Sequence, residues 1–251
     1  MNFPGKKVII FDLDGTVSPS KQPPDKEMSE LLGKLSDKYM VAVVSGGSFE
    51  QFQKQLLSSL RLNPVQKARF FLLPTSGAAL YLWNGRDYET VYQEKISGND
   101  FARIKSELES AIYELSLAPE KTFGEIIEYR GSQVTFSALG QLAPAEVKHL
   151  WDPDQKKRLL IRERLLKTLP DFEINIGGMT SIDITRKGID KAFGIRKLSE
   201  HLKVPISEML YVGDALYSGG NDAVVLQTGI TAVHIKDIEE TKKIISALLE
   251  Q

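Results

Sequence analysis

The chain has 251 residues, of which 42% are hydrophobic and 26% charged, with a formal net charge of -1. This composition indicates a globular protein of one large or two modest domains, and without long runs of one charge it excludes a general nucleic-acid-binding surface. The absence of cysteine excludes disulfides and thiolate metal sites. Since no signal peptide and no bilayer-spanning apolar run are evident, we expect a cytoplasmic protein without nucleic-acid or membrane partners.

The first part of the chain alternates between strand and helix patterns. Apolar residues at 8–11 predict a buried strand, and the helical spacing over 25–35 begins at Asp25, a residue type that caps helices. The next predicted elements are a strand at 39–44, a helix from the capping-box residue Ser48 to about residue 60, and a strand at 70–73. This order predicts a parallel sheet with right-handed crossovers.

The middle of the chain places neighbouring strands together instead. Strands at 80–83 and 88–92 flank an Asn-Gly pair, which is typical of a hairpin. The elements predicted after it are a helix at 100–115, strands at 125–129 and 133–137, a charged helix at 154–169, and strands at 172–176 and 181–184. Consecutive strands of this kind predict an antiparallel α+β unit. We expect its basic run at 156–158 to lie on the solvent face of a helix.

Alternation returns near the C-terminus, with predicted elements at 191–202 (helix), 209–212 and 231–234 (strands) and 238–249 (helix). The expected fold class is therefore α/β, with a doubly wound, Rossmann-like core of parallel strands and an inserted α+β cap domain. We expect the core to consist of residues 1–82 and 187–251, and the cap to consist of residues 83–186.

Two aspartates, Asp12 and Asp14, follow the first predicted strand and precede Gly15. Ligands of open α/β sheets bind at the carboxyl ends of strands, so both carboxylates are expected there. Carboxylates this close repel unless a cation binds them or one keeps a proton, and the glycine allows a sharp turn with N–H groups toward an anion. The pattern favours a nucleophile and an acid/base with Mg²⁺ and phosphate between them. The alternative is a calcium-like or solvated Asp-Gly turn.

Two further segments suit a phosphate. Ser45, Gly46 and Gly47 end the second strand and offer a hydroxyl and backbone N–H groups to a phosphate oxygen, although an ordinary strand-to-helix turn has the same composition. Lys191 begins a predicted helix, where its charge opposes the helix dipole. Its position suggests a nearby anion, and a solvated surface lysine is the alternative.

Acidic residues also follow the strand at 209–212. Asp214 stands at the strand end, and Asn221 and Asp222 come shortly after a Gly-Gly pair. Asp214 can complete a hard-cation site with oxygen ligands. A loop of this composition is otherwise a common turn.

Together these segments resemble the four motifs of the haloacid dehalogenase (HAD) superfamily of phosphotransferases. They occur in the same order: Asp12-Leu13-Asp14-Gly15-Thr16, Ser45, Lys191, and Gly213-Asp214 with Asn221-Asp222. The placement of the insert resembles the larger, C2-type cap class. The chain is also similar to eukaryotic-type phosphomannomutases, a likeness that includes Glu128-Tyr129-Arg130, the segment 151–157, and Gly177-Gly178 through Ser181-Ile182-Asp183.

The resemblance implies a role for each motif. Asp12 would attack phosphorus and become an aspartyl phosphate, while Asp14 would protonate the leaving oxygen and then activate the acceptor. Lys191 completes the implied catalytic set. The implied metal ligands are Asp12, Asp14 through its backbone carbonyl, Asp214 and Asp222, and the metal is Mg²⁺. The implied phosphate and sugar ligands are Ser45, Gly46, Lys21, Arg130, Lys148, Ser181, Asp183 and Asn221. A homodimer through the cap is implied by the resemblance alone.

The chain departs from the family at three positions, where Lys21, Gln141 and Lys148 stand in place of arginines. A mutase must hold a second phosphate far from the nucleophile, and arginine grips phosphate better than lysine or glutamine. Losing one such contact costs about 1.5–3 kcal/mol. We therefore expect a Mg²⁺-dependent phosphatase of small phosphorylated sugars. The alternatives are a phosphomannomutase that interconverts mannose 1-phosphate and mannose 6-phosphate, and a non-catalytic phosphosugar sensor.

Overall fold

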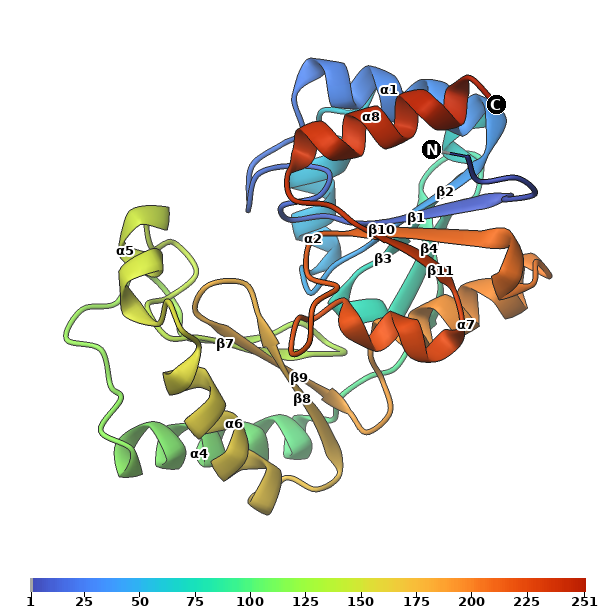
Figure 1. Ribbon diagram of the computed structural model, residues 1–251. Coiled ribbons are helices and arrows are strands. Elements are labelled where there is room, and N and C mark those ends of the chain that lie inside the picture. The colour runs from blue at the N-terminus through green and yellow to red at the C-terminus, as the bar shows by residue number, and fades with distance from the viewer. Residues whose placement is uncertain (1) are drawn as a thin grey trace. The chain divides into compact units, whose positions relative to one another are not determined.

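A computed structural model describes residues 2–251 of the chain (Figure 1). The chain divides into two compact units, which we call the core and the cap. The core combines the segment that ends at Gln93 with Asp190–Gln251, and the cap is Glu94–Ile189. Among the described residues, no helix has the length and apolar character needed to cross a membrane.

The core contains one seven-stranded sheet in the order β11-β10-β1-β2-β3-β4-β5. The first five of these strands are parallel neighbours, and β4 and β5 extend the sheet antiparallel. The strand bounds are β1 (Val8–Asp12), β2 (Met40–Val44), β3 (Phe70–Leu73), β4 (Ala79–Trp83), β5 (Tyr88–Gln93), β10 (Met209–Gly213) and β11 (Thr231–His234). The parallel α/β core expected from the alternation is confirmed.

The central strands β1, β2, β3 and β10 are buried on both faces of the sheet, which is why they are continuously apolar. Ile9 and Phe11 of β1 pack in one cluster with side chains of α1 (Lys26–Lys38) and α8 (Ile238–Leu249), and Figure 1 shows these two helices side by side over the sheet. Val8 and Ile10 pack in a second cluster with α7 (Lys191–Leu202). The alternation of side chains along β1 therefore fixes which helix covers which face.

Shorter helices connect the core strands. They are α2 (Phe49–Phe52), the π-helical turn η1 (Gln53–Leu57), α3 (Pro64–Lys67), and the 3-10 segments η2 (Thr75–Gly77), η3 (Ile206–Glu208) and η4 (Ala223–Thr228). Ser48 caps α2 by accepting a hydrogen bond from the Gln51 N–H, as predicted. The continuous helix expected up to residue 60 is replaced after Phe52 by the wider turn η1.

The cap contains a four-stranded antiparallel sheet in the order β6-β7-β9-β8. Its elements are α4 (Gly98–Glu114), β6 (Ile127–Tyr129), β7 (Val134–Ser137), α5 (Ala145–Trp151), α6 (Lys156–Thr168), β8 (Phe172–Gly177) and β9 (Ser181–Arg186). One face of the sheet packs against α4 and α6, through residues such as Phe136, Ile182 and Leu165. Thr135 and Asp183, paired across β7 and β9, alternate with these residues and so belong to the other face.

The boundary between the units differs from the expected one. The hairpin after residue 82 was expected in the cap, but β5 pairs with β4 and lies in the core sheet, so the chain leaves the core only after Gln93. It returns at Asp190 rather than at 187. Neighbouring strands are typical of the insert, but β4 and β5 instead add an antiparallel edge to the parallel sheet.

Candidate active site

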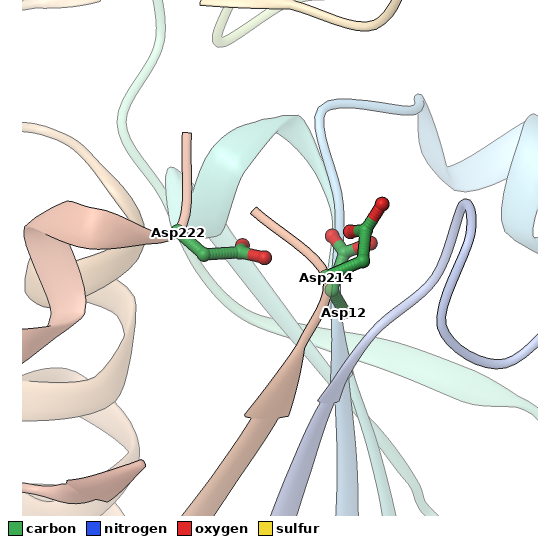
Figure 2. Close-up of side chains that lie close together, drawn as sticks. All are labelled: Asp12, Asp214 and Asp222. Atoms are coloured by element: carbon green, nitrogen blue, oxygen red, sulfur yellow. The ribbon is translucent and has the colours of Figure 1, made fainter. Parts of the chain in front are cut away.

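Three carboxylates meet at the carboxyl ends of the central core strands (Figure 2). Asp12 is the last residue of β1, Asp214 follows β10, and Asp222 immediately precedes η4. Each offers an oxygen, and these oxygens lie within 4.8 Å of one another. Asp12 and Asp222 are buried, while Asp214 is partly buried. The two motifs at opposite ends of the sequence are thus brought together because β1 and β10 are adjacent in the sheet.

Lys191, the first residue of α7, lies between two of these carboxylates. Its Nζ is 2.6 Å from Asp12 Oδ1 and 2.5 Å from Asp222 Oδ1, and all three side chains are buried. Burial works to lower the pKa of Lys191, but the charges of Asp12 and Asp222 outweigh it, so the pKa is raised and the ammonium is kept. These anions also offset the unfavourable position of a cation at a helix N-terminus.

Negative charge exceeds positive charge in this cluster. Burial raises the pKa of Asp12 well above its usual range, and Asp222 and Asp214 raise it further against the opposing effect of Lys191. Burial likewise raises the pKa of Asp214, with a second contribution from Asp222. Three carboxylates face a single ammonium here. A set of hard oxygen ligands with uncompensated charge fits a divalent cation, which would relieve this repulsion.

The loop after β10 is closed around Asp222. The Ala215 N–H donates to Asp222 Oδ2 at 3.1 Å, and the Asp222 N–H donates back to the Ala215 carbonyl at 3.2 Å. A Cβ at Gly213 would be 2.4 Å from Asp222 Oδ2, and one at Gly220 would be 2.1 Å from the Ala215 carbonyl oxygen. Both glycines are therefore required by close approach rather than by turn composition alone. Asn221, named in the same motif, is partly buried beside them.

Tyr211 is a site residue that the sequence reasoning missed. Its hydroxyl donates to Asp222 Oδ1 at 2.5 Å from a fully buried position on β10. Burial, followed by the charge of Asp222, raises the pKa of Tyr211 well above its ordinary value, so it remains a donor. The available signal was a tyrosine in an otherwise aliphatic buried strand, because a buried hydroxyl needs a partner. His234 at the end of β11 also contacts the Asp214 carbonyl, with Nε2 2.9 Å away.

Asp14 lies in the same loop as Asp12 but makes different contacts. Its Oδ1 accepts hydrogen bonds from the Lys21 N–H and from Gln55 Nε2, both at 2.9 Å. Its carboxylate is not a member of the three-carboxylate group. Gly15 packs against that group, because a Cβ there would be 2.6 Å from Asp214 Oδ2. The ligand role expected for Asp14 falls on its backbone carbonyl and stays a prediction.

Ser45 follows β2 at the same sheet edge and is buried. Its Oγ accepts a hydrogen bond from the Gly47 N–H at 3.2 Å, and its carbonyl accepts one from the Ser76 N–H at 2.8 Å. Ser76 belongs to η2, where Thr75, Ser76 and Gly77 all have positive φ angles of 51°, 58° and 84°. Such a left-handed run is strained in non-glycine residues and persists where packing holds it. Gly46, the next residue, is partly buried.

Four of the predicted ligands lie in the cap. Arg130 follows β6, and its Nη2 and Nε are 2.6 and 3.0 Å from Glu128 Oε2. Asp183 on β9 accepts hydrogen bonds at Oδ1 from Thr135 Oγ1 at 2.8 Å and from Gln133 Nε2 at 2.9 Å. Ser181 begins β9. Asp183 is thus hydrogen-bonded to Thr135 on β7 and to Gln133 just before it. The sequence did not indicate either of these two residues as part of the site.

Lys148, the fourth cap residue, lies on α5 rather than on the sheet. Its side chain is buried, and its Nζ is 3.5 Å from the Gln141 carbonyl oxygen. The placement on a helix was not predicted, because the sequence analysis assigned no element between residues 137 and 154.

The basic run at 156–158 is only partly exposed, which corrects the expectation of a solvent face. Arg158 is 2% exposed, and its Nε is 2.7 Å from Asp152 Oδ2. Its Nη1 donates to the Gly177 and Gly178 carbonyls at 3.2 and 2.6 Å. Asp152 also accepts the N–H groups of the first turn of α6. A charge run in the sequence does not reveal that one member faces inward to hold the β8–β9 turn.

Comparisons with known proteins support this reading of the fold and the motifs. Residues 28–251 match the family model described as eukaryotic phosphomannomutase. The phosphomannomutase of Saccharomyces cerevisiae is 23% identical over 248 residues, which covers 96% of this chain and 93% of that protein. A probable phosphomannomutase of Caenorhabditis elegans is 25% identical over 256 residues, covering 98% of this chain and 96% of that protein.

A solved structure shows the same fold at lower identity. An N-terminally truncated, IMP-bound IMP-nucleotidase of Plasmodium falciparum superposes with a TM-score of 0.73 and 16% identity, covering 98% of this chain and 69% of that one. At this identity the likeness bears on the fold alone. The resemblance stated from the motifs is confirmed by the family match, which spans most of the sequence. The chain belongs to the eukaryotic phosphomannomutase family.

Proposed function

We propose that the protein interconverts phosphorylated forms of a small sugar, as a phosphomannomutase acting through an aspartyl phosphate at Asp12. The observation that carries the proposal is the buried Asp12 held by Lys191 beside two more carboxylates, in a chain of this family. The three positions that depart from the family's arginines favour a phosphatase, with the mutase as the alternative. The family match and the named relatives support the alternative better.

The chemistry assigned to the core side chains follows from their positions. A carboxylate oxygen of Asp12 attacks phosphorus as the bond from phosphorus to the sugar oxygen breaks, and Asp14 gives that oxygen a proton. In the second half-reaction the Asp14 carboxylate takes a proton from the accepting hydroxyl, whose oxygen bonds to phosphorus as the Asp12–phosphorus bond breaks. Lys191 stays charged beside Asp12 and stabilises the negative charge on the phosphoryl oxygens. Ser45 Oγ and the Gly46 N–H are assigned to two of these oxygens.

Mg²⁺ is the cation that this set of residues fits best. Asp12, Asp214 and Asp222 would hold it, together with the Asp14 carbonyl, and Asn221 would orient this group. When bound, it supplies charge neutralisation at the transferring phosphoryl group. Tyr211 and the Ala215 N–H fix Asp222 in this role through their hydrogen bonds to its two oxygens.

The cap is proposed to recognise the phosphosugar. Arg130, Ser181 and Asp183 match the family positions for this task, and Lys148 and Lys21 are assigned to phosphate. Asp183 is pre-oriented by Thr135 and Gln133, which suits it to accept a hydrogen bond from a sugar hydroxyl. We assign the chemistry to the core and the choice of sugar to the cap.

Hydrolysis is the second candidate, and two observations favour it. The resemblance to the family implies an arginine at the position of Gln141, and the Arg130 guanidinium is held by Glu128. A sugar phosphate whose distant phosphate is bound by less net positive charge stays for a shorter time on the phosphorylated enzyme. Water then attacks the phosphorus on Asp12 in place of the sugar hydroxyl, and inorganic phosphate leaves as the Asp12–phosphorus bond breaks.

One assay separates the two reactions. Purified protein is given mannose 1-phosphate, Mg²⁺ and a catalytic amount of glucose 1,6-bisphosphate, and both mannose 6-phosphate and free phosphate are measured. The mutase predicts bisphosphate-dependent mannose 6-phosphate with little free phosphate, whereas steady phosphate release identifies the phosphatase. Asp12→Asn should abolish both products. Tight binding of the sugar phosphate without either product would instead indicate the sensor.

A homodimer through the cap and a cytoplasmic location are proposed from the likeness to the family. Leu142 and Leu150 of the cap are 80% and 82% exposed, and exposed apolar side chains of this size suit an interface. Light scattering should give twice the chain mass of 28.0 kDa. Leu150→Glu should convert the dimer to monomers.

A further inference from the structure

Gln55 is a buried polar residue that neither the motifs nor the family likeness singled out. Gln55 is only 4% exposed and lies in the π-helical turn η1. The wider turn is marked by the hydrogen bond from the Ser58 N–H to the Gln53 carbonyl at 3.0 Å. Turns of this kind are rare and occur frequently at functional sites.

The amide of Gln55 has a partner at each end. Nε2 donates to Asp14 Oδ1 at 2.9 Å and to Ser18 Oγ at 3.0 Å, while Oε1 accepts from Gln51 Nε2 at 3.0 Å. The reversed orientation would turn the Gln55 oxygen toward a carboxylate and would set two NH₂ groups against each other. The contacts therefore fix which way the amide points.

The Lys21 N–H and Gln55 Nε2 donate to the same oxygen of the Asp14 carboxyl. Oδ1 accepts from Gln55 Nε2 and from the Lys21 N–H, each at 2.9 Å. Lys21 is held for this contact in a left-handed conformation, with φ 57°. An oxygen that already accepts two N–H groups is a poor place for a proton, so a protonated Asp14 carries it on Oδ2.

We propose that Gln55 is a positioning residue for Asp14, which fixes the carboxyl so that Oδ2 carries the proton given to the leaving sugar oxygen. The inference rests on the proposed phosphoryl transfer. In that step the Oδ2–H bond breaks as the proton passes to the sugar oxygen. The phosphorus–oxygen bond gives its electron pair to the same oxygen, and the new bond forms between phosphorus and Asp12. Gln55 takes no part in these bonds and acts only through Asp14.

The test uses two substrates whose leaving groups differ. An alkoxide of a sugar needs a proton to leave, whereas p-nitrophenolate leaves without one. Gln55→Leu should lower kcat on the sugar phosphate by roughly 10- to 100-fold, which is the range for a displaced general acid. The single-turnover rate of p-nitrophenolate formation should change by less than about threefold, since the step that releases it makes little use of a general acid. Asp14→Asn sets the reference pattern and should show the same selectivity more strongly.

A matched control separates positioning from loss of stability. Gln66→Leu also removes an amide of the core that makes three hydrogen bonds, one from the Asn63 N–H and two to the Gly33 carbonyl and Asp37, but it does not contact Asp14. It should leave the ratio of the two activities unchanged. Gln55→Asn shortens the side chain by one methylene and should show the selective loss too, so it carries the test if Gln55→Leu does not fold.

The outcomes distinguish this inference from the proposed function. If the wild-type protein transfers phosphate from neither substrate, the proposed function fails. If the wild-type protein is active and Gln55→Leu and Gln55→Asn lose activity equally on both substrates, or lose none, Gln55 does not position Asp14. A selective loss with both Gln55 variants and an unchanged ratio with Gln66→Leu supports the inference.

Discussion

The buried charges of the core are not balanced, whereas those of the cap are. In the core, Lys191 faces Asp12 and Asp222, and Asp214 adds a third carboxylate to the same group. In the cap, Arg158 is paired with Asp152, and this pair is completed by carbonyls and N–H groups around it. The core pairs join residues far apart in the sequence, whereas Asp152 and Arg158 are six residues apart.

This difference separates charges that act on a ligand from charges that hold a structure. The core cluster keeps an excess of negative charge, which is costly unless a cation binds and which favours catalysis once it does. The cap pair is balanced without any ligand and anchors a turn.

Removing the buried cation of the core, Lys191, should impair catalysis, whereas removing the buried cation of the cap, Arg158, should impair stability. Lys191→Met should lower kcat on p-nitrophenyl phosphate by at least about 10³-fold, because the ammonium beside the nucleophile is lost. Arg158→Met should leave that turnover nearly unchanged, while it destabilises the protein by about 3–5 kcal/mol through the unpaired Asp152. Steady-state kinetics and urea unfolding measure the two effects. A Lys191→Met enzyme with wild-type turnover would show that the contrast is wrong.

Cation binding should stabilise the core through the uncompensated carboxylates. At about 100 times its Kd, Mg²⁺ should stabilise the wild-type protein by about 2.7 kcal/mol. Asp214→Asn should lose most of this gain. Thermal unfolding with and without Mg²⁺ measures the difference. An equal rise in Tm for both proteins would exclude Asp214 as a ligand.

The same carboxylates set the pH dependence of the metal-free protein. Because the pKa values of Asp12 and Asp214 are raised by burial, the folded state holds protons more tightly than the unfolded state. Stability should therefore fall as pH rises above about 4 and through the raised pKa values. Asp214→Asn should show a shallower fall. Urea unfolding between pH 4 and pH 8 in a chelator gives the slopes, and a flat wild-type profile would contradict the prediction.

A positive charge returned to the cap should shift the reaction toward the mutase. Gln141→Arg places a guanidinium at a position where the resemblance implies an arginine, and one charge-assisted contact of about 1.5 kcal/mol corresponds to roughly tenfold in affinity. The Kd of glucose 1,6-bisphosphate should fall by about that factor, with less free phosphate released for each mannose 6-phosphate formed. Gln141→Leu is the control and should not improve binding.

The smallest expected effect lies in the core but outside the site. Asp25 caps α1 and contacts Lys242 Nζ at 2.7 Å, and the hydrogen bond from Lys242, followed by the one from the Met28 N–H, lowers its pKa. Asp25→Ala should cost about 1 kcal/mol at pH 7. A lowered pKa of Asp25 stabilises the fold only at pH values above the pKa of this group in the unfolded chain. The difference in unfolding free energy between the wild type and Asp25→Ala should therefore become smaller as pH falls below about 4. Unfolding at pH 7 and pH 3 measures it, and a constant difference would assign the effect to packing.

The sequence predicted those parts of the fold that follow from local pattern. Strand β1, the cap at Asp25 and the parallel core could be read from apolar runs and capping residues, and Asp12, Lys191, Asp214 and Asp222 from motifs at strand and helix ends. Gln55 and Arg158 could not be found this way, because a helical pattern does not show a π turn or an inward-facing cation. The place of β5 depended on which strand it pairs with, a long-range choice that its own residues do not encode.

The return from cap to core has a consequence for chimera construction. The boundary lies between Ile189 and Asp190, one residue before Lys191. On the cap side, the Thr185 hydroxyl donates to the Ile189 carbonyl, and on the core side Asp190 accepts from the Phe193 N–H at 2.8 Å. Because Lys191 directly follows the N-cap Asp190, we expect a graft that adds or removes a residue here to disturb the start of α7 and the placement of the ammonium beside Asp12. A transplanted cap should therefore be joined upstream of Thr185, so that the native segment 185–191 is kept together with the hydrogen bonds on both sides of the junction.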